Sequence, residues 1–190
     1  MRQRILDAAK QLFVKEGFEN VSLRRIAGKI QYSPAAIYRY FKNKREILSV
    51  LREEGFARYV ARQERGMKAY PDPVERLRIG GKRYIEFSHQ EPDYYQLMFS
   101  TDCTQVDLDG EWAVSSRITY TIFRSTVEEC IAKGHFGSAD LDTAVFSLWS
   151  GVHGMAHLIA TGQANMLSGG LNFDTLLDAM IAFWMRPGSS

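Results

Sequence analysis

Apolar residues recur at helical spacing along most of the 190-residue chain. In the first segment Ile5, Leu6, Leu12 and Phe13 share one face, with charged residues between them. No segment of useful length alternates apolar and polar residues as a half-buried strand does. The pattern therefore predicts an all-α fold of about nine helices. After the first helix, the other eight helices are expected at residues 23–30, 34–41, 43–68, 73–91, 92–100, 108–133, 139–161 and 173–185.

Glycine and small polar residues mark the ends of the first four helices. Gly17 is expected to end the first in left-handed geometry, and Ser22 to cap the second. Ser33 is expected to cap the third, and Asn43 with Glu46 to form a capping box on the fourth. Three short helices with a tight break between the second and third predict a helix-turn-helix unit.

The third helix is the candidate for DNA recognition. Its spacing turns Ile37 and Phe41 inward, while Ala35 and Ala36 are small enough to approach base edges and thymine methyl groups. Around it lie side chains that suit phosphate, and a capped helix start such as that at Ser22 offers N–H groups as well. The predicted DNA-binding residues are Ser22, Arg25, Ser33, Pro34, Ala35, Ala36, Tyr38, Arg39, Tyr40, Lys42 and Lys44.

The formal net charge of +2 hides an uneven distribution. Residues 1–70 contain 16 Lys and Arg against 7 Asp and Glu, whereas residues 71–190 contain 8 against 15. A basic head on an acidic body is typical of a chain that binds a polyanion. An ordinary solvated helical face carries similar charge, so charge alone does not decide between the two.

The eighth expected helix has no charged face, because residues 143–173 contain no Asp, Glu, Lys or Arg. Such a helix is buried all round or spans a membrane. His153, Gly154 and His157 interrupt its apolar run, which argues against a span. We expect Ser138 to cap this helix, and we expect its burial to be shared between its own chain and a second subunit.

A homodimer follows from this helix and the last one. Small residues let a partner helix approach closely, and two such helices from each subunit can form a four-helix interface. A dimer also presents two recognition helices to the half-sites of a palindromic double-stranded operator. The predicted interface residues are Ser147, Gly151, Gly154, Leu158, Leu176, Leu177, Met180, Phe183 and Trp184.

The head resembles the TetR/AcrR family of transcriptional regulators. The resemblance covers residues 2–50 and is carried by Ser-Pro-Ala-Ala-Ile-Tyr-Arg-Tyr-Phe-Lys-Asn-Lys at 33–44, with supporting matches at 17–18 and 21–27. It implies a DNA-binding regulator, a repressor that a small-molecule effector releases from its operator. It also implies that Tyr38 and Lys44 hold backbone phosphates, and that the major groove is faced by Pro34, Ala35, Ala36 and Arg39.

The turn departs from the family pattern at two positions. Gln31 and Tyr32 stand where the family usually has glycine and valine. We expect Gln31 to be held in left-handed geometry at some energetic cost. We expect Tyr32 to take the place of the core valine.

The body also resembles this family's ligand-binding domain, in particular its Trp/His-Gly subfamily. Residues 149–154 and 91–99 carry that resemblance. We therefore expect a DNA-binding domain at 1–48 and a ligand-binding and dimerisation domain at 49–190. Aromatic residues, some with polar tips, concentrate in the second of these domains. A site for a small ligand is a mostly apolar pocket with a few polar groups, which these residues can supply. The predicted ligand-binding residues are Tyr84, Phe87, Tyr94, Met98, Phe99, Trp112, Tyr120, Phe123, Trp149 and His153. For any single one of them, an ordinary helical core is the better explanation, and only the cluster as a whole, with the family resemblance, favours a pocket.

Other chemistries find little support. His153 and His157 have metal-ligand spacing, but no carboxylate accompanies them, so no metal or cofactor is expected. Cys103 and Cys130 do not make a disulfide framework. Cys103 has no apparent resolving cysteine for a redox sensor. The motifs of serine hydrolases, phosphate-binding loops and zinc proteases are missing, so no enzyme is expected.

The start of the chain has no signal-peptide pattern, so we expect a cytoplasmic protein without a membrane segment. The alternative function is a helical ligand-binding or adaptor protein that does not bind DNA. Such a protein has no need for exposed Tyr38, Arg39, Lys42 and Lys44 around a short helix.

Overall fold

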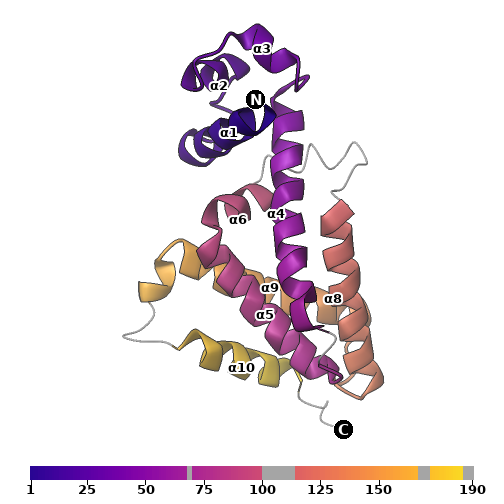
Figure 1. Ribbon diagram of the computed structural model, residues 1–190. Coiled ribbons are helices and arrows are strands. Elements are labelled where there is room, and N and C mark those ends of the chain that lie inside the picture. Colours follow the sequence, from indigo (N-terminus) through magenta and orange to yellow (C-terminus); the bar gives the residue numbers. More distant parts are fainter. Residues whose placement is uncertain (68–69, 100–113, 167–171, 186–190) are drawn as a thin grey trace. The chain divides into compact units, whose positions relative to one another are not determined.

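The structure is a computed structural model that describes residues 1–67, 70–99, 114–166 and 172–185. Within these ranges it contains nine α-helices, one 3-10 helix and no strand (Figure 1), so the all-α prediction is confirmed. Trp112, Cys103 and the start of the predicted seventh helix lie outside the described residues. The helices are α1 (Arg2–Glu16), α2 (Leu23–Lys29), α3 (Pro34–Tyr38), α4 (Lys44–Met67), α5 (Pro73–Gln90), α6 (Pro92–Met98), α8 (Val114–Ala132), α9 (Leu141–Ala160), the 3-10 helix η2 (Gln163–Met166) and α10 (Phe173–Trp184).

The chain divides into two compact units. Unit 1 comprises residues 1–58 and 91–117, and unit 2 comprises residues 59–90 and 118–190. Helices α4 and α8 both begin in unit 1 and continue into unit 2. The functional boundary expected after residue 48 stays a prediction. Within the described ranges, no helix combines the length and the apolar character that crossing a bilayer requires.

The core of unit 1 is built by the first four helices together. Leu6 of α1, Ile26 of α2, Ile37 of α3 and Leu48 of α4 are all 0% exposed. Burying each such side chain contributes about 1.5–3 kcal/mol. Helices as short as α2 and α3 are not stable alone in water, so this shared core is what holds them.

The predicted caps of α2 and α4 are confirmed. The Ser22 hydroxyl accepts a hydrogen bond from the N–H of Arg25 at 3.1 Å. The Asn43 side chain accepts one from the N–H of Glu46 at 2.9 Å. The Glu46 carboxylate in turn accepts from the N–H of Lys42 at 2.6 Å. These bonds satisfy backbone N–H groups that have no partner within a helix.

The predicted caps at Ser33 and Ser138 have different outcomes. Ser33 occupies the N-cap position of α3 as predicted, but its side chain makes no capping hydrogen bond, and the N–H of Ala36 bonds to its backbone carbonyl instead. The Ser138 cap is wrong. Helix α9 begins two residues later than a Ser138 cap requires. Its cap is Asp140, which accepts from both the N–H (3.0 Å) and the hydroxyl (2.7 Å) of Thr143. A charged carboxylate favours a helix start more than a hydroxyl does.

The turn between α2 and α3 confirms one expectation and corrects another. Gln31 has φ 60°, the left-handed geometry predicted for it. Tyr32 is 45% exposed, so the prediction that it replaces a core valine is wrong. Its ring instead lies against the guanidinium of Arg4 at 5.2 Å. Ile30, 8% exposed, supplies the neighbouring apolar side chain of the core.

Unit 2 has its own core between α5, α8 and α9. Its centre joins Leu77 of α5, Val127 of α8 and Leu148 of α9. Helix α10 packs closely on α5, since a Cβ added to Gly81 would lie 3.2 Å from a methyl group of Leu177. Phe136, in the loop between α8 and α9, has φ 69° and is 7% exposed. Burial of its ring in this core offsets the strained backbone.

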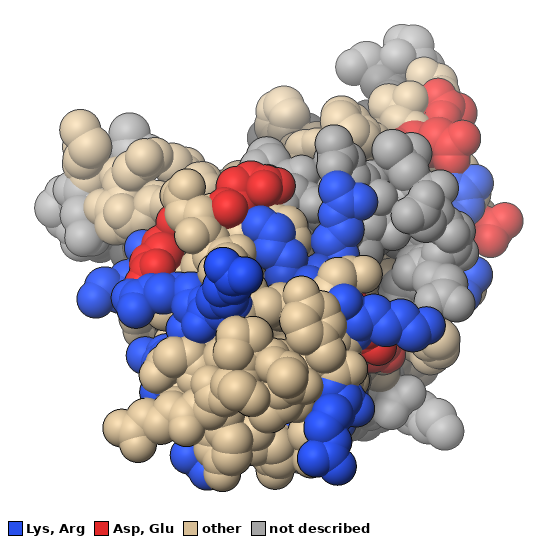
Figure 2. Space-filling model, turned by 90° about the horizontal axis from the view of Figure 1, so that it is seen from above, with Lys and Arg blue, Asp and Glu red and all other residues tan. Residues whose placement is uncertain are grey.

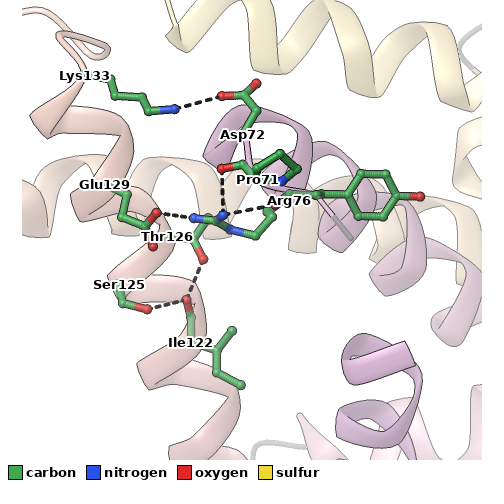
Figure 3. Close-up of polar contacts among 9 residues, drawn as sticks. Pro71, Asp72, Arg76, Ile122, Ser125, Thr126, Glu129 and Lys133 are labelled. Carbon is green, nitrogen blue, oxygen red and sulfur yellow. Dashed lines mark hydrogen bonds and ion pairs between the residues drawn. The ribbon is translucent and has the colours of Figure 1, made fainter. Parts of the chain in front are cut away.

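Polar contacts fasten the start of α5 to the end of α8 (Figure 3). Arg76 donates to the carbonyl oxygens of Tyr70 and Pro71, both at 3.1 Å, and forms an ion pair with Glu129. Lys133 pairs with Asp72 at 3.4 Å. The Arg76 side chain is only 17% exposed, so this contact is better shielded than an ordinary surface pair. The connection into α5 is thereby fixed on α8.

Replacing Gln31 by glycine tests the strain in the turn. A glycine adopts a positive φ at little cost, so Gln31→Gly is expected to raise the free energy of unfolding by about 1 kcal/mol. Denaturant titration measures the change. Gln31→Ala keeps the Cβ atom and is expected to give no such gain. Equal stability of the two variants would contradict the strain.

Candidate DNA interface and effector site

Helix α3 is anchored on one side and presents the other outward. Ile37 is 0% exposed and Phe41, just after the helix, is 2% exposed, as predicted. Tyr38 is 61% exposed, and Ala35 and Arg39 are exposed as well. Two inward side chains thus hold the helix, and the outward ones can meet a ligand without disturbing the core.

The remaining predicted DNA-binding residues lie around α3. Figure 2 looks onto the α2–α3 end of unit 1, where Lys and Arg side chains border an uncharged surface. A cationic border around a neutral centre suits DNA, because phosphates flank the base edges of a groove. Ser22, Arg25, Ser33, Tyr40 and Lys42 are exposed, whereas Pro34, Ala36 and Lys44 are half-buried.

Lys44 contacts the protein itself. Its ammonium donates to the carbonyl oxygens of Phe18 at 2.9 Å and Glu19 at 3.2 Å, and lies 4.3 Å from the centre of the Phe18 ring. It therefore ties the loop between α1 and α2 to the start of α4. Its role as a phosphate contact stays a prediction, and that role requires some of these bonds to exchange for phosphate.

Arg25 is also paired. It forms an ion pair of 2.8 Å with Glu16. The hydrogen bond that Arg25 donates to Glu16 raises the pKa of Arg25 and lowers the pKa of Glu16. The pair links α1 to α2 and leaves the Arg25 side chain 57% exposed, so it remains open to an approaching phosphate.

In unit 2 the structure brings together four of the predicted ligand-binding residues. The Tyr84 hydroxyl lies 2.7 Å from Nδ1 of His153, and the rings of Trp149 and His153 lie 6.2 Å apart. Tyr59, which the sequence did not single out, stands edge-on to both Tyr84 and Phe87 at 5.5 Å. Helices α4, α5 and α9 each contribute to this aromatic cluster, which combines a mostly apolar surface with a few polar tips.

Gln63 adds a second unpredicted member to the aromatic cluster. Its amide nitrogen donates to the Tyr59 hydroxyl and to the carbonyl oxygen of Gly80 at 3.1 Å. Its amide oxygen is buried and has no hydrogen-bond partner. A buried acceptor without a partner costs free energy, so a ligand N–H or O–H that reached it would be favoured. Both Tyr59 and Gln63 lie on the helical stripe of α4 that continues from Phe56.

The polar groups of the aromatic cluster at Tyr59 and His153 are neutral. A cation lies against the cluster, since the Arg62 guanidinium is 5.4 Å from the centre of the Phe87 ring. Burial, and then the nearby charge of His157, lowers the pKa of His153, so its imidazole is neutral near pH 7. Burial also raises the pKa of the Tyr59 hydroxyl. Neutral donors and acceptors in an apolar setting suit a neutral polar group on a ligand better than an unpaired charge.

The other predicted ligand-binding residues lie elsewhere. In unit 1 Tyr94 lies between Lys10 of α1 at 4.3 Å and Arg58 of α4 at 4.7 Å, and its hydroxyl donates to Glu54 at 3.0 Å. Burial, and then the bond to Glu54, raises the pKa of Tyr94 to about 12. Tyr94 therefore joins α6 to the helices of the head.

Four further predicted ligand-binding residues have contacts or exposure of their own. Met98 and Phe99 also pack on α4, beside Gly55 and Phe56. In unit 2 Phe123 packs against the core, and Tyr120 is 47% exposed. The contacts thus gather Tyr84, Phe87, Trp149 and His153 into one cluster, and the ligand role of all ten predicted residues stays a prediction.

Some of the predicted interface residues pack within their own chain, and others are open to a partner. Gly151 faces its own chain, since an added Cβ would lie 2.3 Å from the Trp184 ring. Leu177 is likewise buried, at 2% exposed. At Gly154 an added Cβ would meet nothing within 4 Å, and Phe183 is 64% exposed.

An apolar groove of about 340 Å³ runs between α9, η2 and α10. Apart from Ser150 its lining is apolar or glycine, and it includes Gly154, Leu158 and Leu176 of the predicted interface. Ser147 and Met180 are half-buried. The role of this groove in a dimer interface stays a prediction. No group of three metal-ligating side chains forms in the described part of the chain.

Known families match both parts of the chain. Residues 5–51 match the bacterial regulatory proteins of the tetR family, and residues 77–184 match the tetracyclin repressor-like C-terminal domain. The chain belongs to the TetR family. The part that matches the family's N-terminal model runs from α1 into α4, and α2 and α3 form the helix-turn-helix within it.

Individual relatives agree with this assignment. The regulator YvkB of Bacillus subtilis (strain 168) is 47% identical over 49 residues, 26% of either chain. The repressor KstR of Mycobacterium tuberculosis (strain ATCC 25618 / H37Rv) is 34% identical over 76 residues, 40% of this chain and 34% of KstR. The matched segment thus spans about a third or less of these relatives, which are both transcriptional regulators.

A solved structure shares the whole fold. AibR in complex with isovaleryl coenzyme A and operator DNA superposes with a TM-score of 0.73 at 18% identity, over 98% of this chain and 99% of AibR. This likeness shows that the TetR-family fold extends along the entire described chain.

Proposed function

We propose that this TetR-family chain is a repressor that binds a palindromic operator as a homodimer and leaves it when a small molecule binds. The observation that carries the DNA-binding half is α3, whose inward residues are buried and whose Tyr38 and Arg39 face outward within a basic border. We assign the chain no enzymatic activity and place it in the cytoplasm, where operator DNA is accessible. An adaptor without DNA binding does not account for this exposed basic surface.

The aromatic cluster of unit 2 is the proposed effector site. Its apolar rings and neutral polar groups suit a small, largely apolar molecule with a hydrogen-bonding group. The resemblance of residues 149–154 to the Trp/His-Gly motif supports this place. AibR, whose structure holds both isovaleryl coenzyme A and operator DNA, shows that the fold accommodates both kinds of ligand.

Release requires that the effector bind the DNA-incompetent arrangement more tightly than the competent one. A coupling of about 1–3 kcal/mol weakens operator binding roughly 5–150-fold. Helix α4 is the proposed route, because it carries Lys44 and Leu48 in unit 1 and Tyr59 and Gln63 in unit 2.

Salt titrations test DNA binding. With a labelled pool of random-sequence duplexes, Lys42→Ala is expected to weaken binding and to lower the salt slope by about one unit, because one phosphate loses its cation. Tyr38→Phe is expected to weaken binding without changing the slope. Lys133→Ala, which removes a charge just after the end of α8 in unit 2, is the control. A wild-type slope for a folded Lys42→Ala protein would rule out the phosphate contact.

Substitutions at two glycines of α9 distinguish an effect on dimer formation from an effect on folding stability. Gly154→Leu is expected to turn a dimer into a monomer of 21.7 kDa, because its side chain would fill the groove offered to the partner. Gly151→Ala is expected to lower stability instead, since Trp184 leaves no room for a methyl group. Light scattering and thermal unfolding measure the two effects. Ala61→Leu, an exposed small position on α4, is the control, and a monomeric wild type at micromolar concentration would disprove the interface.

A further inference from the structure

Unit 1 has an open hollow of about 350 Å³ beside the recognition helix. Its lining consists of Met1, Tyr32, Ala36, Arg39 and Tyr40. Ala36 and Arg39 belong to the surface that faces the major groove by resemblance to the family. The hollow therefore opens on the DNA side of the head, and Tyr32 of the turn shares it with α3.

Arg4 holds the side chain of Tyr32 in place. Its guanidinium lies 5.2 Å from the Tyr32 ring centre, and one N–H donates to the phenol oxygen at 3.3 Å. A second guanidinium nitrogen lies 3.5 Å from the carbonyl oxygen of Ile30, at the end of α2. Because the phenol oxygen accepts from Arg4, its own proton is left to donate elsewhere.

We propose that Tyr32 is a further DNA-contacting residue, whose hydroxyl donates a hydrogen bond to one backbone phosphate seated at this hollow. The inference rests on the DNA-binding function and adds a contact at a position where the family pattern has a core valine. Tyr32 is 45% exposed and Tyr40, across the hollow, is 41% exposed. Their phenols and the Arg39 guanidinium are all donors, and a phosphate offers only acceptors.

The arrangement favours a phosphate over a base edge. Tyr32 lies in the turn rather than on α3, and half to two-thirds of protein–DNA hydrogen bonds go to the phosphates and sugars, tyrosine hydroxyls among their donors. The positive charge of Arg4 polarises the phenol, so the hydrogen bond to an anion is strengthened. Arg4 itself adds attraction for phosphate at this edge of the head. Tyr32 therefore contributes affinity for DNA of any sequence.

The test uses fluorescence anisotropy of the full chain with a labelled pool of random-sequence duplexes. Tyr32→Phe keeps the ring and removes only the hydroxyl, and it is expected to weaken binding roughly tenfold, as for a lost hydrogen bond to a charged group. The salt slope is expected to stay the same, since no charge is removed. Tyr70→Phe removes a hydroxyl from unit 2, outside the proposed DNA-binding and effector sites, and is expected to leave DNA binding unchanged.

A double-mutant cycle tests the role of Arg4. Arg4→Met is expected to weaken binding, and to do so less in the Tyr32→Phe background, because the two side chains act together. Thermal unfolding of each variant shows whether the fold is intact. Tyr32→Val supplies a second variant, with the residue the family usually has, and is expected to bind at least as weakly as Tyr32→Phe.

The outcomes separate this inference from the DNA-binding function. If Tyr32→Phe binds as the wild type does while Lys42→Ala binds more weakly, the Tyr32 contact is wrong and the function stands. If Tyr32→Phe changes only which sequences are preferred, the hydroxyl reads a base and the phosphate assignment is overturned. If the wild type does not bind the pool at all, the DNA-binding function itself fails.

Discussion

Burial of Ile37 and Phe41 in the core of unit 1 is the constraint on which the DNA interface depends. Helix α3 has only five residues, too few to be stable by itself. Its position comes from these two side chains and from the apolar residues of α1, α2 and α4 that receive them. The outward direction of Tyr38 and Arg39 follows, because side chains on a helix point to fixed sides. A loss of core packing would therefore displace the DNA-contacting side chains, even though these residues themselves were unchanged.

A different constraint acts in unit 2, because helix α9 lacks a charged side chain over most of its length. One face of α9 packs against α5, where Tyr84 meets His153. Another face is closed by Trp184 at Gly151, and a third remains open at Gly154. The same helix thus serves the proposed effector site and the proposed dimer interface. An effector that moved α9 would reach both at once, which gives the proposed repressor a physical route from ligand to assembly.

The sequence predicted the features that depend on neighbouring residues. Helix spacing, the caps at Ser22 and Asn43, and the left-handed geometry of Gln31 are all set within a few positions. Features set by distant parts were missed. The contact of Tyr32 with Arg4 crosses 28 positions, and the bond of Lys44 to Phe18 crosses 26. The predicted ligand-binding residues are divided between the two units, which the sequence did not show, since an apolar stripe on α6 or α8 does not reveal which helix covers it.

The most direct test of the account is a selection of DNA by the wild-type protein. Repeated binding to a library of random duplexes, followed by sequencing, reports both affinity and the symmetry of the preferred site. The account predicts enrichment of an inverted repeat, whose half-sites are spaced about one helical turn or a multiple apart, since two α3 helices of a dimer address them. Recovery of the library without enrichment, or failure to retain DNA, would contradict a sequence-specific regulator.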